Sequence, residues 1–107
     1  MDHIRILIVD DHPMMREALT AALMEENDME VIGQAAEGNE ALKLLETRQP
    51  DVILMDLLMQ GMGGLEAIEK IIAINPSARI LVFTSLEDEE KILAAVRNRT
   101  NPLRNAD

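Results

Sequence analysis

The chain has 107 residues, with 20 acidic and 10 basic side chains, no cysteine and a formal net charge of −10. This length allows one domain with a single core. The charge argues against a nucleic-acid surface, because phosphate binding needs clustered Lys and Arg. The lack of cysteine excludes disulfides and thiolate metal sites, and no apolar run approaches the roughly 20 residues that span a bilayer. We therefore expect a cytoplasmic domain that binds neither nucleic acid nor membrane.

Short apolar runs alternate with helical patterns in the first half of the chain. Residues 4–9 predict a strand buried on both faces, because the run is short and almost uninterrupted. Pro13 suits the first turn of a helix to about residue 26, whose apolar residues at helical spacing are Met15, Ala18, Leu19, Ala22 and Leu23. Residues 30–35 predict a shorter strand near an edge. A helix marked by Ala41, Leu42 and Leu45 then ends before Pro50.

The same alternation continues in the second half. Residues 52–55 predict a strand, and a loop rich in glycine follows it. The next helix has an apolar stripe of Leu65, Ile68, Ile71 and Ile72, which we expect to be core. Residues 79–83 predict a fourth strand, and residues 88–97 a fourth helix with Ile92, Leu93 and Val96 inward. Strands that alternate with helices predict an α/β fold with a doubly wound parallel sheet covered on both faces.

The periodic pattern stops at residue 98. Residues 98–107 have no apolar periodicity, and Leu103 is their only large apolar residue. We therefore expect a domain over residues 1–97 and a solvated tail over residues 98–107.

Three acidic residues follow two of the predicted strands. Asp10 and Asp11 come directly after the first strand, and Asp56 comes directly after the third. Ligands of open parallel sheets bind at the carboxyl ends of the strands. If the two strands are neighbours, the carboxylates converge, and each pair of charges about 4 Å apart repels by about 4 kcal/mol at an effective dielectric of 20. Such a cluster needs a proton or a cation, and Mg²⁺ is the natural oxygen-bound cation.

Other polar residues have simpler interpretations. The acids at positions 87–90 are better explained as complements to a helix N-terminus than as a second cation site. His3 and His12 are expected to be surface histidines rather than ligands. Of Met14 and Met15, periodicity places one in the core and leaves the role of the other open.

Four segments in order carry a family resemblance: IRILIVDDHPMMREAL, EVIGQAAEGNEAL, PDVILMDLLMQGMGGLEAI and ARILVFTS. Over residues 1–97 the chain resembles the receiver domain of bacterial two-component response regulators. The His-Pro after the acid pair and the segment TSLEDEEKI are most similar to the NarL/FixJ (LuxR-type) subfamily. The resemblance implies a flavodoxin-like (CheY-like) fold, no enzyme activity of the usual kind, and a role in phosphorelay signal transduction and transcription regulation.

The resemblance also implies residue roles. Asp56 would be the phosphoacceptor for a sensor histidine kinase. Asp11, Asp56 and the backbone carbonyl of Leu58 would bind Mg²⁺ or Mn²⁺, with Asp10 holding a coordinated water. Thr84 would donate its hydroxyl to a phosphoryl oxygen. Phosphoryl transfer depends mostly on positioning and charge neutralisation, which explains why carboxylates and a metal suffice.

The chain departs from the family at its C-terminal end. The family continues with a fifth strand that carries a switch aromatic and a phosphoryl-binding Lys, then a fifth helix; in register these two residues fall on Leu103 and Ala106. We therefore expect a sheet of order 2-1-3-4 that lacks the fifth strand and fifth helix. The first helix would lose its neighbour and expose some of Ala18, Leu19, Ala22 and Leu23. The unprotected fourth strand, with the fourth helix, would form a homodimer or larger assembly.

Two other functions compete with the phosphoacceptor hypothesis. A haloacid-dehalogenase-like phosphatase also uses Asp and Mg²⁺, but its two acids are separated by one residue, whereas Asp10 and Asp11 are adjacent. A receiver without the family Lys can instead act only as a non-phosphorylated dimerisation or interaction module. Modification of Asp56 separates this third hypothesis from the first.

Overall fold

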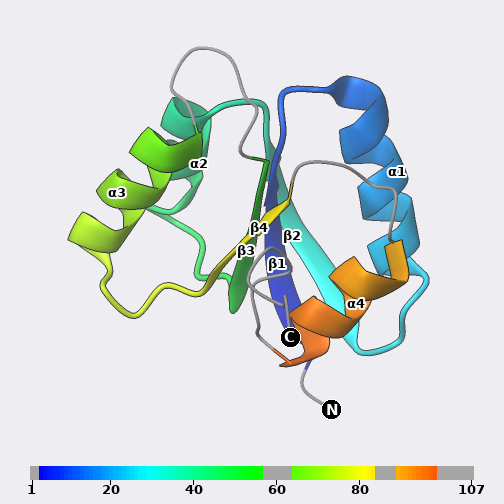
Figure 1. Ribbon diagram of the computed structural model, residues 1–107. Coiled ribbons are helices and arrows are strands. Elements are labelled where there is room, and N and C mark those ends of the chain that lie inside the picture. The colour runs from blue at the N-terminus through cyan, green and yellow to red at the C-terminus, as the bar shows by residue number, and fades with distance from the viewer. Residues whose placement is uncertain (1–2, 57–63, 84–88, 99–107) are drawn as a thin grey trace.

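The computed structural model describes residues 3–56, 64–83 and 89–98, and within them four parallel strands form one sheet with helices on both faces (Figure 1). The strands are β1 (Ile4–Val9), β2 (Met29–Ala35), β3 (Val52–Asp56) and β4 (Ile80–Phe83). The helices are α1 (Pro13–Met24), α2 (Gly38–Leu44), α3 (Gly64–Ile74) and α4 (Glu89–Asn98). The order β2-β1-β3-β4 confirms the predicted doubly wound, flavodoxin-like topology.

The register of the two central strands determines where the acids lie. β1 pairs in parallel with β3 so that Val9 is opposite Met55. Asp10 directly follows Val9, and Asp56 directly follows Met55. The pairing therefore brings these two positions to the same level of the sheet. The backbone N–H of Asp10 donates to the carbonyl of Ala35 at 3.0 Å, which fixes the end of β1 against β2 as well.

Alternate residues of the strands build a core on each face of the sheet, as the period of a strand requires. On one face, Ile6, Ile8, Leu54 and Phe83 pack with buried residues of α1 and α4. On the other face, the strand residues Leu7, Val9, Met55 and Val82 pack with α2 and α3. The strands are therefore buried on both sides, which matches their continuous apolar sequences.

Helix α4 lies on the same face of the sheet as α1 (Figure 1). Its residues Ile92, Ala95 and Val96 are buried in the core that they share with Leu19 and Leu23. At the end of α4, the Arg97 guanidinium pairs with two acids that follow α1. Its Nε donates to Asp28 Oδ2 at 3.0 Å, and one of its terminal nitrogens contacts Glu26 Oε1. These hydrogen bonds and charges raise the pKa of Arg97.

The expected exposure of α1 is correct only in part. Ala18 is exposed and Ala22 is half-buried, but Leu19 and Leu23 are fully buried. The two leucines are buried because they pack in the core that α1 shares with α4.

The expected core stripe of α3 is also wrong in part. Ala67 and Ile71 are buried and Ile68 is half-buried, but Leu65 is 71% exposed and Ile72 is 43% exposed. The apolar residues of α3 occupy a wider arc than the face that meets the sheet, so its edges remain in solvent. In α1, Met15 packs against the core while Met14 is exposed.

The C-terminal end of α4 lies close to the expected boundary of the domain. Helix α4 includes Asn98, one residue beyond the boundary expected for the domain, and residues 99–107 lie outside the described residues. Among the helices described, none combines the length and apolar character that crossing a membrane requires.

The placement of α4 can be tested with a pair of isoleucines. Ile92→Ala is expected to destabilise the protein by about 2–5 kcal/mol, because Ile92 is buried and its truncation leaves a cavity. Ile74→Ala in α3 is the matched control and should change stability by less than about 0.5 kcal/mol, because Ile74 is 73% exposed. Urea denaturation measures both values. Equal effects of the two substitutions would contradict the packing of α4 described above.

Candidate functional site

Three carboxylates meet at the carboxyl end of the sheet. Asp10 follows β1, Asp11 is the next residue, and Asp56 is the last residue of β3. Asp10 is fully buried and Asp56 is 1% exposed, whereas Asp11 is half-buried. Two adjacent strands therefore bury charged groups at the edge where the sequence predicts a ligand.

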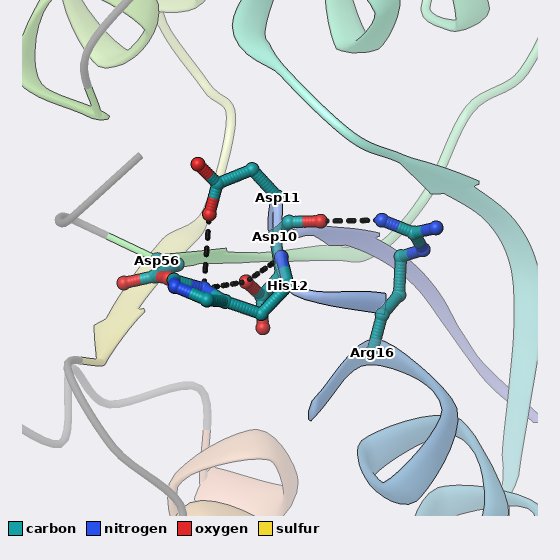
Figure 2. A network of polar contacts seen from close by, with 5 residues as sticks. All are labelled: Asp10, Asp11, His12, Arg16 and Asp56. Atoms are coloured by element: carbon teal, nitrogen blue, oxygen red, sulfur yellow. Dashed lines mark hydrogen bonds and ion pairs between the residues drawn. The ribbon is translucent and has the colours of Figure 1, made fainter. Parts of the chain in front are cut away.

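His12 joins the three acids (Figure 2). Its Nδ1 lies 3.0 Å from Asp10 Oδ1, 2.9 Å from Asp11 Oδ1 and 3.4 Å from Asp56 Oδ2. The hydrogen bond to Asp10, followed by the charge of Asp11, raises the pKa of His12 above its ordinary value of 6.5. The imidazole is thus within 3.4 Å of an oxygen of each of the three carboxylates.

The local backbone explains this arrangement. The backbone N–H of His12 donates to Asp10 Oδ1 at 2.9 Å, which is a turn that an aspartate commonly forms with the residue two positions later. Pro13 begins α1, and the carbonyl of His12 accepts the N–H of Arg16 at 2.9 Å. The Arg16 side chain returns to the turn, where Nη1 donates to the carbonyl of Asp10 at 2.7 Å. The positive N-terminal end of α1 also favours nearby carboxylates.

The donor set fits a hard divalent cation. One donor atom from each of Asp10, Asp11, His12 and Asp56 lies within 4.8 Å of every other. Asp10 Oδ2 is buried and has no hydrogen-bond partner among the described residues. A buried carboxylate oxygen without a partner is costly, and a cation satisfies it. Carboxylate oxygens are the ligands that Mg²⁺ and Mn²⁺ prefer.

The outcomes for the predicted site residues differ. Asp10, Asp11 and Asp56 converge as the sequence predicts. Leu58 and Thr84 lie outside the described residues, so their roles stay predictions. The two acids at positions 87 and 88 also lie outside the described residues.

The two histidines that we expected at the surface are indeed mostly exposed. His3 pairs with Glu30 across 3.8 Å, at the opposite end of β1 from the acids. The His12 side chain is 55% exposed, but its ring contacts the acids, which sequence reasoning missed. Its position beside Asp11 was the available signal. Arg16 was also missed, and nothing in its spacing marks the contact with Asp10.

A separate cavity lies at the other end of the sheet, where β1 and β3 begin. Its volume is about 470 Å³, and its lining includes Arg5, Arg48, Pro50 and Ile71 but none of the three acids. The candidate site is therefore assigned from the buried acids, and this cavity is not part of it.

Comparisons with known proteins agree with the acid cluster. The family model of the response regulator receiver domain matches residues 6–101. The chain is 44% identical to the transcriptional regulatory protein LiaR of Bacillus subtilis over 93 residues, which are 87% of this chain and 44% of that protein. It thus spans less than half the length of this curated relative.

Two solved structures are also similar. The signal receiver domain of the putative response regulator NarL from Mycobacterium tuberculosis is 30% identical, with a TM-score of 0.73, covering 94% of this chain and 81% of that one. A LuxR-family two-component response regulator from Aurantimonas is 32% identical, with a TM-score of 0.74, covering 94% of this chain and 71% of that one.

The acid cluster makes a prediction about stability with and without metal. In buffer free of divalent cations, Asp56→Asn should stabilise the fold by about 1 kcal/mol, a fraction of the roughly 4 kcal/mol between close charges because His12 already offsets part of it. The melting temperature would rise by about 4–8 °C. Mg²⁺ at 100 times the Kd of the wild type should stabilise the wild type by about 2.7 kcal/mol. The same concentration should stabilise Asp56→Asn by less and Asp11→Asn hardly at all. Thermal denaturation of the three proteins, each with EDTA and with Mg²⁺, measures these effects, and a wild type that does not respond to Mg²⁺ would contradict the assembled site.

Proposed function

The chain belongs to the response regulator receiver domain family, and on this premise we propose that Asp56 accepts a phosphoryl group from a sensor histidine kinase. The observation that carries the proposal is the convergence of Asp10, Asp11 and Asp56 at the carboxyl end of the sheet. A protein with this role is a switch in phosphorelay signal transduction, whose covalent state reports the activity of the kinase.

The proposed reaction is an in-line transfer. A carboxylate oxygen of Asp56 forms a bond to phosphorus as the phosphorus–nitrogen bond of the kinase phosphohistidine breaks. The bonding electron pair returns to the kinase imidazole, which then takes up a proton. The product is an aspartyl phosphate, an established type of covalent intermediate. Burial at the end of β3 positions the Asp56 carboxylate, because its backbone is held by the pairing of β3 with β1 and β4.

The other acids prepare the site for a divalent cation. We propose that Asp11, Asp56 and the backbone carbonyl of Leu58 hold Mg²⁺ or Mn²⁺, and that Asp10 holds a water on the cation. When bound, the cation neutralises charge on the transferring phosphoryl oxygens. Thr84 is proposed to donate its hydroxyl to a phosphoryl oxygen. Asp10 and Asp11 also keep a high negative charge beside Asp56, which makes the pocket dependent on a cation.

The family relatives support a place for this receiver in transcription regulation. LiaR is a transcriptional regulatory protein, and the Aurantimonas structure is a LuxR-family regulator. We propose that the chain serves as the receiver of a LuxR-type transcriptional regulator in the cytoplasm. The adjacent acids and the family match both disfavour a dehalogenase-like phosphatase.

We also propose a homodimer built through β4, with α4 at the border of the interface. Within residues 3–56, 64–83 and 89–98, β4 pairs only with β3, so its other edge carries backbone groups suited to pairing with a second chain. Residues 80–83 are apolar and contain no proline. The apolar side of α4 packs on the sheet, so α4 offers its outer side to such a partner.

Phosphorylation can be measured directly. Incubation of the protein with acetyl phosphate and Mg²⁺ should add the mass of one phosphoryl group, detected by intact mass spectrometry. Asp56→Asn should abolish the addition because the acceptor oxygen is gone. Asp51→Asn is the matched control and should be modified like the wild type, because Asp51 pairs with Arg5 at the opposite end of the sheet.

The non-phosphorylated interaction module predicts a different result in the same experiment. A wild type that binds Mg²⁺, stays folded and gains no phosphoryl group from acetyl phosphate or a kinase would contradict the phosphoacceptor role. It would favour the non-phosphorylated interaction module instead.

The homodimer predicts a second pair of variants. Light scattering of the wild type at micromolar concentration should give the mass of a dimer or larger assembly. Ile80→Lys should give a monomer, because an edge lysine opposes strand pairing between chains. Ile74→Lys, on the exposed end of α3, should leave the mass unchanged. A folded wild type that is monomeric would exclude this interface.

A further inference from the structure

We propose that His12 controls the cation affinity of the acid cluster, because its imidazole and a divalent cation bind the same carboxylate oxygens and exclude each other. This inference rests on the proposed function, which places the cation among those carboxylates. It assigns to His12 a role that the three acids do not have. The imidazole contacts the carboxylates when no cation is bound, and it moves away from them when a cation binds.

The distances place the imidazole among the oxygens that the cation needs. His12 Nδ1 lies 2.9 Å from Asp11 Oδ1 and 3.4 Å from Asp56 Oδ2, and both carboxylates are proposed cation ligands. Magnesium binds oxygen at about 2.0–2.1 Å and requires near-octahedral geometry. A ring nitrogen this close to both oxygens occupies space that a cation bound to the same oxygens would need. Each carboxylate oxygen therefore has two alternative partners.

The burial of the cluster indicates which member moves. Asp10 and Asp56 are buried. The backbone N–H of Asp10 donates to the carbonyl of Ala35 in β2, and Asp56 pairs with Phe83 in β4, so both backbones are held by the sheet. The His12 side chain is 55% exposed, so its ring can rotate into solvent without displacing the core. The backbone N–H of His12 donates separately to Asp10 Oδ1 at 2.9 Å. The turn can therefore remain in place while the ring leaves.

The ring is one of the groups that contact the buried acids in the absence of a cation. Of the described residues, His12 is the one whose side-chain nitrogen contacts an oxygen of all three carboxylates. Arg16, the other nearby cationic side chain, donates to the backbone carbonyl of Asp10 rather than to a carboxylate. Removal of the imidazole should therefore leave these carboxylate oxygens accessible to a cation and strengthen the affinity for Mg²⁺.

The test compares Mg²⁺ affinities by isothermal titration calorimetry at one fixed pH and ionic strength. His12→Ala is expected to bind Mg²⁺ about two- to fivefold more tightly than the wild type, the range that corresponds to one partly exposed ionic contact. His3→Ala is the matched control and should bind like the wild type, because His3 lies at the other end of β1. Circular dichroism confirms that each variant is folded.

A second measurement uses the unaltered chain. In NMR spectra of the wild type, titration with Mg²⁺ should shift the ring signals of His12 towards the values of the exposed His3, while His3 stays constant. Ring signals of His12 that do not respond to saturating Mg²⁺ would refute the exchange. An unchanged Mg²⁺ affinity of His12→Ala would refute it too, and a weaker affinity would assign His12 as a cation ligand instead.

These outcomes are separable from those of the proposed function. Normal addition of a phosphoryl group to Asp56 in both the wild type and His12→Ala, with equal Mg²⁺ affinities, would reject the role of His12 and retain the phosphoacceptor. Absence of Mg²⁺ binding in every variant would reject both.

Discussion

The repulsion between carboxylates at the end of β1 and β3 is the constraint on which the rest of the site depends. The register of two central strands brings Asp10 and Asp56 to the same level, and Asp11 is the adjacent residue on the turn. Buried like charges are unfavourable unless a cation or a hydrogen-bond donor compensates them. His12 contacts oxygens of all three carboxylates, the N-terminal end of α1 lies close in sequence, and the proposed divalent cation would be a further compensating group.

The rigid part of the structure holds this unfavourable arrangement in place. Apolar side chains pack on both faces of the strands directly beneath the acids, including Val9 and Met55 on one face and Leu54 and Phe83 on the other. These contacts supply the burial that offsets the local cost. A cluster of charges at the edge of such a core responds strongly to ligands, because its partners can change while the strands stay in position.

Local patterns predicted the four strands and the three acids: apolar runs of strand length, and acids directly after two of them. The strand order was expected from the family resemblance, because local patterns do not say which strands are neighbours. The position of His12 beside Asp11 indicated that it lies near the acids, but not which atoms it contacts, because the direction of its side chain depends on the turn formed by Asp10 and on Pro13. The sequence also did not predict which face of the sheet α4 covers. The pattern of Ile92 and Val96 identifies a buried side of the helix, but the side of the sheet that it meets is decided by tertiary packing and by the contacts of Arg97.

The parallel pairing of β1 with β3 has a consequence for how the chain folds. The segment from residue 10 to residue 56 contains α1, β2 and α2, so contact between Asp10 and Asp56 closes a long loop. Contacts between residues far apart in sequence slow folding. The repulsion between Asp10 and Asp56 therefore arises when β1 pairs with β3, and not when the individual helices form. Cations and charge-removing substitutions at the cluster are then expected to change the folding rate if β1 and β3 already pair in the transition state, and the unfolding rate if they pair later.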